Sequence, residues 1–291
     1  MRLGDAPESG NFEDRTGQSG GGRSLGGMGG GIFALIFQLV ASRFGIIGIL
    51  ILGLGYCALT SLGGGGGGIL GTGGTSPTEQ GVSKLDPATG KLLKGVLGST
   101  EQVWGQVFEQ AGATYKPTTL VAYTGGSQSG CGAAQAAMGP FYCPTDQKIY
   151  IDPAFFDELT RRFGAPGDAA QAYVIAHEVG HHVQYLEGTL ARGQAAQGSA
   201  GRAGGNQIQV GIELQADCYA GVWAQRSGLL EAGDIEEGMR AAEAIGDDTL
   251  QRQSQGVVVP ESFTHGTSAQ RKEALNRGLS TGNPAQCNYA R

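Results

Sequence analysis

The apolar positions of the chain form two continuous runs near its start, and regular helical or alternating patterns appear only later. Residues 32–41 are mostly apolar, and residues 44–62 follow with 19 residues and no charge. A helix of that length spans about 28 Å, close to the ~30 Å hydrocarbon core of a bilayer. A core helix would carry a polar face, and a signal peptide would begin nearer Met1. The pattern therefore predicts one transmembrane helix at residues 44–62.

The charges around this segment predict its orientation. Arg15, Arg23 and Arg43 precede the span, and the next basic residue is Lys84. Because basic flanking segments stay in the cytoplasm, the positive-inside rule places the N-terminus there. We expect a single-pass protein of the cell membrane whose folded domain is extracytoplasmic, in the periplasm or outside the cell.

The distribution of glycine separates the folded domain from the segments before it. The chain has 54 Gly among 291 residues, and 28 of them fall in residues 1–98. Residues 1–31 contain so few apolar side chains that their burial would not offset the entropy of ordering. We expect a disordered, cytoplasmic, Gly-rich tail at 1–43, a flexible linker at 63–98 after the span, and one domain at 99–291.

Within residues 99–291 the patterns change from short alternating runs to longer helical ones. Strands are predicted at 119–124 and 148–151. The helical pattern is clearest at 168–187, where Gly188 is a typical stop signal. Further helices are expected at 99–111, 153–163, 206–226, 233–247 and 267–278. Short strands followed by helices predict an α+β fold with a small sheet.

Net charge and cysteine usage narrow the class of protein. The formal net charge of −6 argues against a nucleic-acid binder, which needs a basic face. Cys57 lies in the apolar run, whereas four cysteines lie in the expected domain, an even number that suits disulfides in an oxidising compartment. Three pairings are open to them, and buried free thiols are the alternative. The local pair Cys131–Cys143 is favoured, which leaves Cys218–Cys287.

Three of the four histidines lie in one stretch of the best-predicted helix, His177-Glu178-Val179-Gly180-His181-His182. This is an HExxH motif. Residues i and i+4 share a helix face, so His177 and His181 can bind one Zn²⁺. Glu178 then lies beside the metal, where its carboxylate can act as general base towards a metal-activated water. Gly180 between them would allow close helix packing.

A catalytic zinc needs a third protein ligand. The HExxHxxGxxH pattern fails, since Gln184 and Glu187 occupy its Gly and last His positions. Glu213 and Asp217 stand one turn apart in a later helical stretch. We expect Glu213 to bind the metal and Asp217 to accept a hydrogen bond from the ring of a ligand histidine. The alternative is an exposed acidic pair on a solvated helix.

Other candidates for the site have competing interpretations. His265 follows a Pro260 turn and could stabilise a developing oxyanion, or it could merely pack against the next helix. Arg271 is a second candidate for the oxyanion role. His182 lies about 100° round the helix from His181, which favours a packing or supporting role. Tyr173 lies one turn before His177 and is expected to pack.

Five blocks in this order resemble a known family, the bacterial neutral zinc metallopeptidases, a gluzincin-like group of predicted membrane proteins. The blocks are residues 11–18, 129–152, 177–184, 213–221 and 262–271. The resemblance implies a zincin-like α+β metallopeptidase domain with one zinc ion. It implies His177, His181 and Glu213 as zinc ligands and Glu178 as general base, and it leaves the substrate open.

These observations together predict a membrane-anchored zinc peptidase that acts on a peptide or protein substrate. Two alternatives remain at the level of sequence. One is a zinc hydrolase of a non-peptide amide or ester. The other is a catalytically silent zinc-binding module that mediates interactions at the membrane, although such a site would have no need of Glu178.

Overall fold

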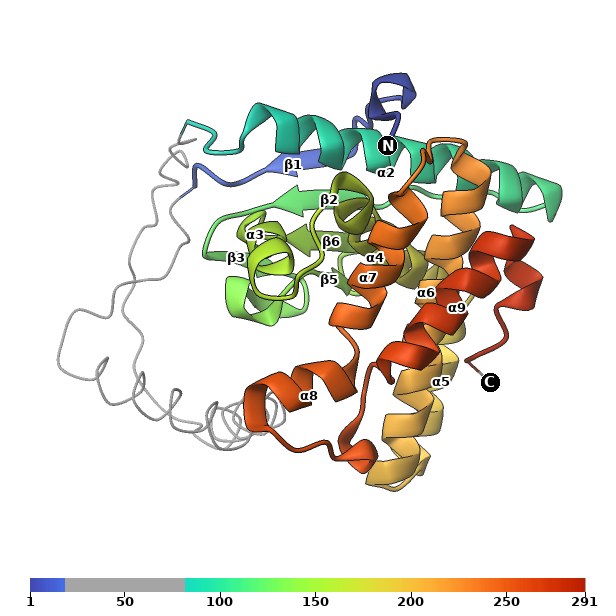
Figure 1. The fold of residues 1–291 in the computed structure, drawn as a ribbon. Coiled ribbons are helices and arrows are strands. Elements are labelled where there is room, and N and C mark those ends of the chain that lie inside the picture. Colours follow the sequence, from blue (N-terminus) through green and yellow to red (C-terminus); the bar gives the residue numbers. More distant parts are fainter. Residues whose placement is uncertain (19–81, 291) are drawn as a thin grey trace, which may run out of the picture. The chain divides into compact units, whose positions relative to one another are not determined.

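The computed structural model describes residues 1–18 and 82–290 of the chain (Figure 1). The predicted span at 44–62, Cys57 and most of the predicted linker lie outside these residues. Within the described part, no helix has both the length and the apolar character needed to cross a membrane. The predicted transmembrane helix is therefore not supported by the structure, whereas the α+β architecture with small sheets fits the prediction.

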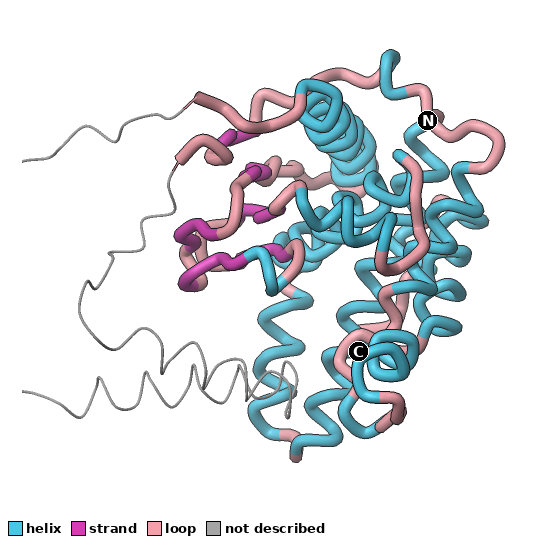
Figure 2. The backbone as a smooth tube through the Cα atoms, turned by 60° about the vertical axis from the view of Figure 1, so that its left-hand side comes forward, coloured by secondary structure: helices cyan, strands magenta, loops and turns pink. Residues whose placement is uncertain are grey.

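A four-stranded mixed sheet lies beside the helices, and Figure 2 shows the strands gathered on one side of them. Its order is β1 (Phe12–Asp14), β2 (Thr119–Ala122), β6 (Lys148–Ile151) and β5 (Phe141–Cys143). The first three strands run parallel, and β5 is antiparallel to β6. A separate hairpin joins β3 (Gly126–Ser129) to β4 (Gly132–Gln135). Both predicted strands are present, and each is fully buried over its last three residues.

The N-terminal residues are part of this fold, so the prediction of a disordered tail is wrong for residues 1–18. Strand β1 pairs with β2, Leu120 N–H donates to the Asn11 carbonyl at 3.0 Å, and Arg15 N–H donates to Ala122 at 2.7 Å. Glu13 accepts from Lys148 on β6. A three-residue strand has too little periodicity to be recognised, and its stability comes from partners more than 100 positions away.

This pairing also corrects the predicted topology. Residues 1–18 and 82–290 belong to one compact unit, in which Lys84 N–H donates to Thr16 Oγ1 at 3.0 Å. A single membrane crossing between them would put the two segments on opposite sides of a bilayer. A cytoplasmic N-terminus combined with an extracytoplasmic domain is therefore incompatible with the fold.

Helix α2 (Pro87–Gln110) begins twelve residues before the predicted start, within the segment expected to be a linker. Asp86 caps it, since Thr89 N–H donates to Asp86 Oδ2 at 2.9 Å, and Pro87 occupies the first turn, where its missing N–H costs nothing. Leu93, Val96 and Leu97 are fully buried. The glycines in the first half of α2 weaken its helical pattern, so the sequence alone did not predict this part of the helix.

The remaining helices pack around α4 and α6. The predicted helices at 153–163, 168–187, 206–226, 233–247 and 267–278 are present with shifted ends, whereas α5 and α8 were not predicted. Their bounds are α3 Ala154–Arg161, α4 Asp168–Leu186, α5 Thr189–Ser199, α6 Arg202–Ser227, α7 Asp234–Ala244, α8 Asp247–Gln255 and α9 Ser268–Thr281. Gly188, at φ +76°, follows the end of α4, where the sequence predicted a stop.

Close backbone contacts between helices determine how the site is assembled. A Cβ atom on Gly180 of α4 would lie 2.9 Å from the carbonyl oxygen of Ala216 on α6. The two helices can therefore approach closely only because residue 180 has no side chain. Both favoured disulfides are present, with Cys131 bonded to Cys143 and Cys218 to Cys287.

Candidate metal centre

Three side chains from two helices converge where α4 crosses α6. His177, His181 and Glu213 each offer one ligand atom, and these atoms lie within 4.8 Å of one another. Glu213 Oε2 is 3.2 Å from His177 Nε2 and 3.5 Å from His181 Nε2. The two histidines share a face because they are one helical turn apart, and Gly180 lets α6 bring Glu213 against that face.

The donor set and its spacing fit a zinc ion. Two imidazole nitrogens and one carboxylate oxygen are a common zinc set, and tetrahedral bonds of about 2.0–2.1 Å separate ligand atoms by roughly 3.3 Å. The two N–O separations given above lie on either side of that value. These residues would therefore hold one Zn²⁺ through their Nε2 and Oε2 atoms, with a fourth position left for water or substrate.

Each ligand histidine has its other ring nitrogen bound to an acceptor. His177 Nδ1 donates to Asp217 Oδ1 at 2.7 Å, and His181 Nδ1 donates to Gln184 Oε1 at 2.9 Å. A proton on Nδ1 leaves the Nε2 lone pair free for a metal. The structure thus places Asp217 where the sequence predicted, on the ring of a ligand histidine.

Asp217 is itself fully buried and is balanced by a second charge. Arg271 binds it through two hydrogen bonds of 2.8 Å, and Tyr173 donates to Asp217 Oδ1 at 2.6 Å. Arg271 is only 2% exposed, and its guanidinium lies 3.5 Å from His177 Nδ1, the nitrogen that faces away from Glu213. Arg271 therefore lies behind the ligand and supports Asp217, a position that does not suit the oxyanion role.

The charges of this cluster favour a bound cation. Burial alone lowers the pKa of His177, but the carboxylates of Asp217 and Glu213 outweigh it and raise the pKa to about 10. Burial raises the pKa of Glu213, but the neighbouring His181 and His177 outweigh burial and hold this pKa well below the usual range of a carboxyl group. Next to two buried, ionised carboxylates, the imidazoles bind either protons or a metal ion, so protons and the metal compete for the site.

Glu178 of α4 and His265 of the loop after α8 both interact electrostatically with the ligand cluster. Glu178 is 7% exposed on α4, and its charge raises the pKa of His181 after the larger effects of burial and Glu213. His265 has a side chain that is 40% exposed. Its ring is close enough to Glu213 for that carboxylate to raise its pKa, together with Asp247 and against the effect of burial.

Asp247 organises the loop that carries His265, although no sequence motif marks it as a residue of the site. Its Oδ2 accepts from the backbone N–H groups of Thr264 and His265 at 2.6 Å each, and its Oδ1 lies 3.2 Å from His265 Nδ1. Because Asp247 opens α8, 17 positions before Thr264, only the folded structure relates Asp247 to the loop.

His182 has a structural role, as its position round the helix suggested. Its ring is fully buried, accepts from Tyr142 of β5 at Nδ1 and donates from Nε2 to the Lys116 carbonyl. It therefore joins the metal-binding helix to the edge strand of the sheet. In the sequence, Gln184 is notable only as a mismatch to the HExxHxxGxxH pattern. Its position three residues after His181 nevertheless places it on the same helix face.

The comparisons with known proteins extend over nearly the whole chain. A family model described as "Putative neutral zinc metallopeptidase" matches residues 1–290. The uncharacterized protein YpfJ of Escherichia coli strain K12 is 47% identical over 295 residues, which cover 99% of this chain and 98% of that protein. The uncharacterized protein Rv2575 of Mycobacterium tuberculosis strain H37Rv is 45% identical over 179 residues, covering 57% of this chain and 59% of that protein. No solved structure matches the chain.

Proposed function

Because the chain belongs to the neutral zinc metallopeptidase family, whose model matches it from residue 1 to residue 290, we propose that it cleaves peptide bonds with a zinc-activated water. The observation that carries the proposal is the convergence of His177 Nε2, His181 Nε2 and Glu213 Oε2 around one point, with both Nδ1 atoms bound to acceptors. Bound zinc would lower the pKa of a water molecule and polarise the substrate carbonyl.

The residues of the chain would divide the proton transfers between them. Glu178 accepts a proton from the attacking water and returns it to the leaving amine. His265 donates a hydrogen bond to the oxygen on which negative charge develops. Burial lowers the pKa of this ring, but its partner Asp247 raises it and outweighs burial, which favours the protonated form that can donate. Asp217 keeps His177 in the tautomer that leaves Nε2 free.

The Glu178→Gln variant tests this division of roles. Since Gln keeps the size of Glu178 but has no basic oxygen, kcat should fall about 10²–10⁴-fold while bound zinc is retained. Zinc content would be measured by elemental analysis, and cleavage with a peptide library. Glu158→Gln on the exposed surface of α3 is a control that should leave both unchanged.

Two results would contradict the proposal. Full peptidase activity in Glu178→Gln would remove the general base from the mechanism. A wild-type protein that binds no zinc, or binds it and cleaves no peptide in the library, would favour a different function for the site.

We further propose that the folded unit works in an oxidising, extracytoplasmic compartment. Both disulfides of the described unit support this, because structural disulfides persist mainly outside the cytoplasm. Alkylation of the full chain taken directly from cells should label one of its five cysteines before reduction and all five after it. Labelling of three or more before reduction would show that the disulfides do not form in the cell.

A further inference from the structure

Gln184 contacts His181, a proposed zinc ligand, on one side. On its other side it contacts α6, the helix that carries the proposed ligand Glu213. Gln184 is fully buried on α4. Its Oε1 accepts from His181 Nδ1 at 2.9 Å, and its Nε2 donates to the Ile212 carbonyl at 2.8 Å. Ile212 immediately precedes Glu213 on α6. One side chain therefore links His181 to the backbone that carries Glu213.

A second buried amide continues this link away from the site. Gln184 Nε2 also donates to Gln215 Oε1 at 2.9 Å, and Gln215 Nε2 donates to the Cys287 carbonyl at 2.9 Å. Cys287 is bonded to Cys218 on α6. These hydrogen bonds form one continuous series, from His181 through Gln184 and Gln215 to the carbonyl oxygen of Cys287 beside the disulfide.

The direction of every hydrogen bond in this series is determined by the backbone carbonyl groups that it contacts. The carbonyl oxygens of Cys287 and Ile212 can only accept, so each glutamine must turn its NH₂ group towards them. Gln184 then has only its oxygen to offer His181, and that oxygen requires a proton on Nδ1. Flipping either side-chain amide would leave buried donors and acceptors without partners, so the orientation described here is the stable one.

We propose that Gln184 and Gln215 are positioning residues that hold His181 in its Nδ1-protonated, metal-binding tautomer. The Cys218–Cys287 disulfide then fixes the end of the hydrogen-bonded series at Cys287. His181 thus depends on a neutral amide pair, whereas His177 depends on the Asp217 carboxylate. The inference rests on the zinc site proposed above.

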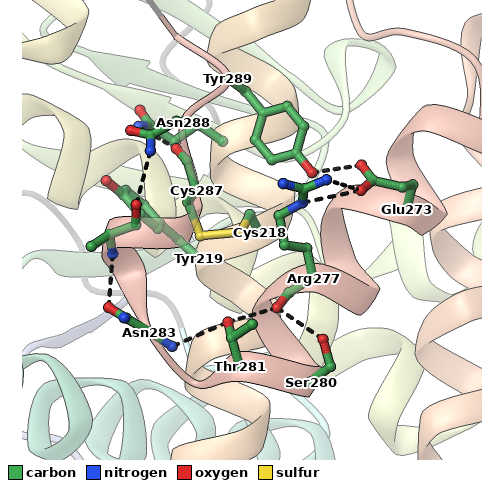
Figure 3. The surroundings of a disulfide bond; sticks show 12 residues. Cys218, Tyr219, Glu273, Arg277, Ser280, Thr281, Asn283, Cys287, Asn288 and Tyr289 are labelled. Carbon is green, nitrogen blue, oxygen red and sulfur yellow. Dashed lines mark hydrogen bonds and ion pairs between the residues drawn. A yellow bond between two sulfur atoms is a disulfide. The ribbon is translucent and has the colours of Figure 1, made fainter.

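The segment around Cys287 is held firmly enough to serve as that end. Figure 3 shows the disulfide with the residues that fasten the C-terminal segment around it. Tyr289 OH donates to Glu273 of α9 at 2.6 Å, and Asn283 Oδ1 accepts from Ala285 N–H at 3.0 Å. Cys287 itself is 1% exposed, so its carbonyl has a defined position relative to α6.

The test is the zinc dissociation constant of the full chain, measured by competition with a chelator. Gln184→Met keeps the volume and removes the acceptor, and it should weaken zinc binding by about 10- to 100-fold. Gln215→Met removes the support behind Gln184 and should weaken binding by a smaller factor.

The control separates positioning from general loss of stability. Ser99→Ala removes another buried hydrogen bond, the one that Ser99 accepts from Trp223, and should lower stability without changing zinc affinity. In nitrogen NMR spectra of the zinc-loaded protein, the Nδ1–H signal of His181 should be present in wild type and weakened or shifted in Gln184→Met.

Unchanged zinc affinity in a folded Gln184→Met variant would overturn the inference. If that variant does not fold, unchanged affinity in Gln215→Met would overturn it instead. A wild-type protein that binds no zinc at all would contradict the proposed function, so the two failures are distinguishable.

Discussion

At the scale of single residues, Asp247 shows how one carboxylate can order a loop of the site. It accepts hydrogen bonds from the backbone of Thr264 and His265 and from the His265 ring. Burial raises the pKa of Asp247, but these hydrogen bonds outweigh that effect and lower it below its ordinary value of 3.8. The ionised form is therefore the one that the folded protein stabilises.

This sign predicts how the contribution of Asp247 depends on pH. A carboxyl whose pKa is lower in the folded state stabilises the fold above its unfolded pKa of 3.8, and the effect is lost as the pH falls through the folded value. At pH 7, Asp247→Asn should lower the free energy of unfolding by about 1–3 kcal/mol. Urea denaturation should show this difference shrinking as the pH is taken below 3.8.

Glu261→Gln is the matched control for that titration, because Glu261 is an exposed carboxylate at the start of the same loop. Glu261→Gln should change the free energy of unfolding by less than about 0.5 kcal/mol, both at pH 7 and below pH 3.8. A difference for Asp247→Asn that grows towards low pH would contradict the assigned sign.

At the scale of elements, two glycines allow the backbones of α6 and α9 to touch. A Cβ atom on Gly278 of α9 would lie 1.9 Å from the Cys218 carbonyl oxygen, and one on Gly221 of α6 would lie 2.1 Å from the Leu275 carbonyl oxygen. Real Cβ atoms do not approach backbone so closely, so any side chain there would force the helices apart. Arg271 reaches Asp217 from α9, so this spacing also sets the support behind the site.

Gly278→Ala should therefore destabilise the protein although alanine favours helices. We expect the free energy of unfolding to fall by about 2 kcal/mol or more, because overpacked backbone cannot relax as a flexible side chain can. Gly198→Ala on α5, where an added Cβ would meet nothing within 4 Å, should instead raise it by up to about 1 kcal/mol. Denaturant titrations of the two variants would contradict this packing if both were stabilised.

At the scale of the whole described unit, the N-terminal segment is held against helix α2. A Cβ atom on Gly98 would lie 1.9 Å from the Pro7 carbonyl oxygen, and Ser9 N–H donates to the Lys94 carbonyl at 3.0 Å. Ser9 Oγ also donates to Glu101 at 2.6 Å. Residues 1–18 are thus bound both to this helix and, through β1, to the sheet.

Gly98→Ala distinguishes a packed N-terminal segment from a free tail. If the segment is packed, the added methyl should displace it, lower the free energy of unfolding by about 1–3 kcal/mol and increase hydrogen exchange of the amides in residues 9–16. Gly105→Ala on the same helix, with open space at its Cβ, should be neutral or stabilising by up to about 1 kcal/mol. Equal effects of the two substitutions, with unchanged exchange at β1, would mean that the segment is not packed as described.

What could be predicted from the sequence depended on short-range regularity. The pairing of His177 with His181, and of Glu213 with Asp217, follows from one helical turn, which holds in any fold that keeps the helix. The disulfide Cys131–Cys143 closes a loop of only 12 positions. The boundaries of α2 and the order of residues 1–18 were missed, because frequent glycines weaken the local pattern while tertiary contacts stabilise the elements.

By itself, the sequence determined which residue types could hold a metal and in which helices they lie. Only the tertiary structure decided that Glu213 Oε2 meets both Nε2 atoms, that Arg271 supports Asp217 from behind, and that Gln184 is held in place by Ile212 and Gln215. It also decided that Phe12–Asp14 is a strand of the same unit. The physical reason is the range of the contacts: a helical turn relates residues four positions apart, whereas these interactions join segments whose approach depends on the packing of the entire fold.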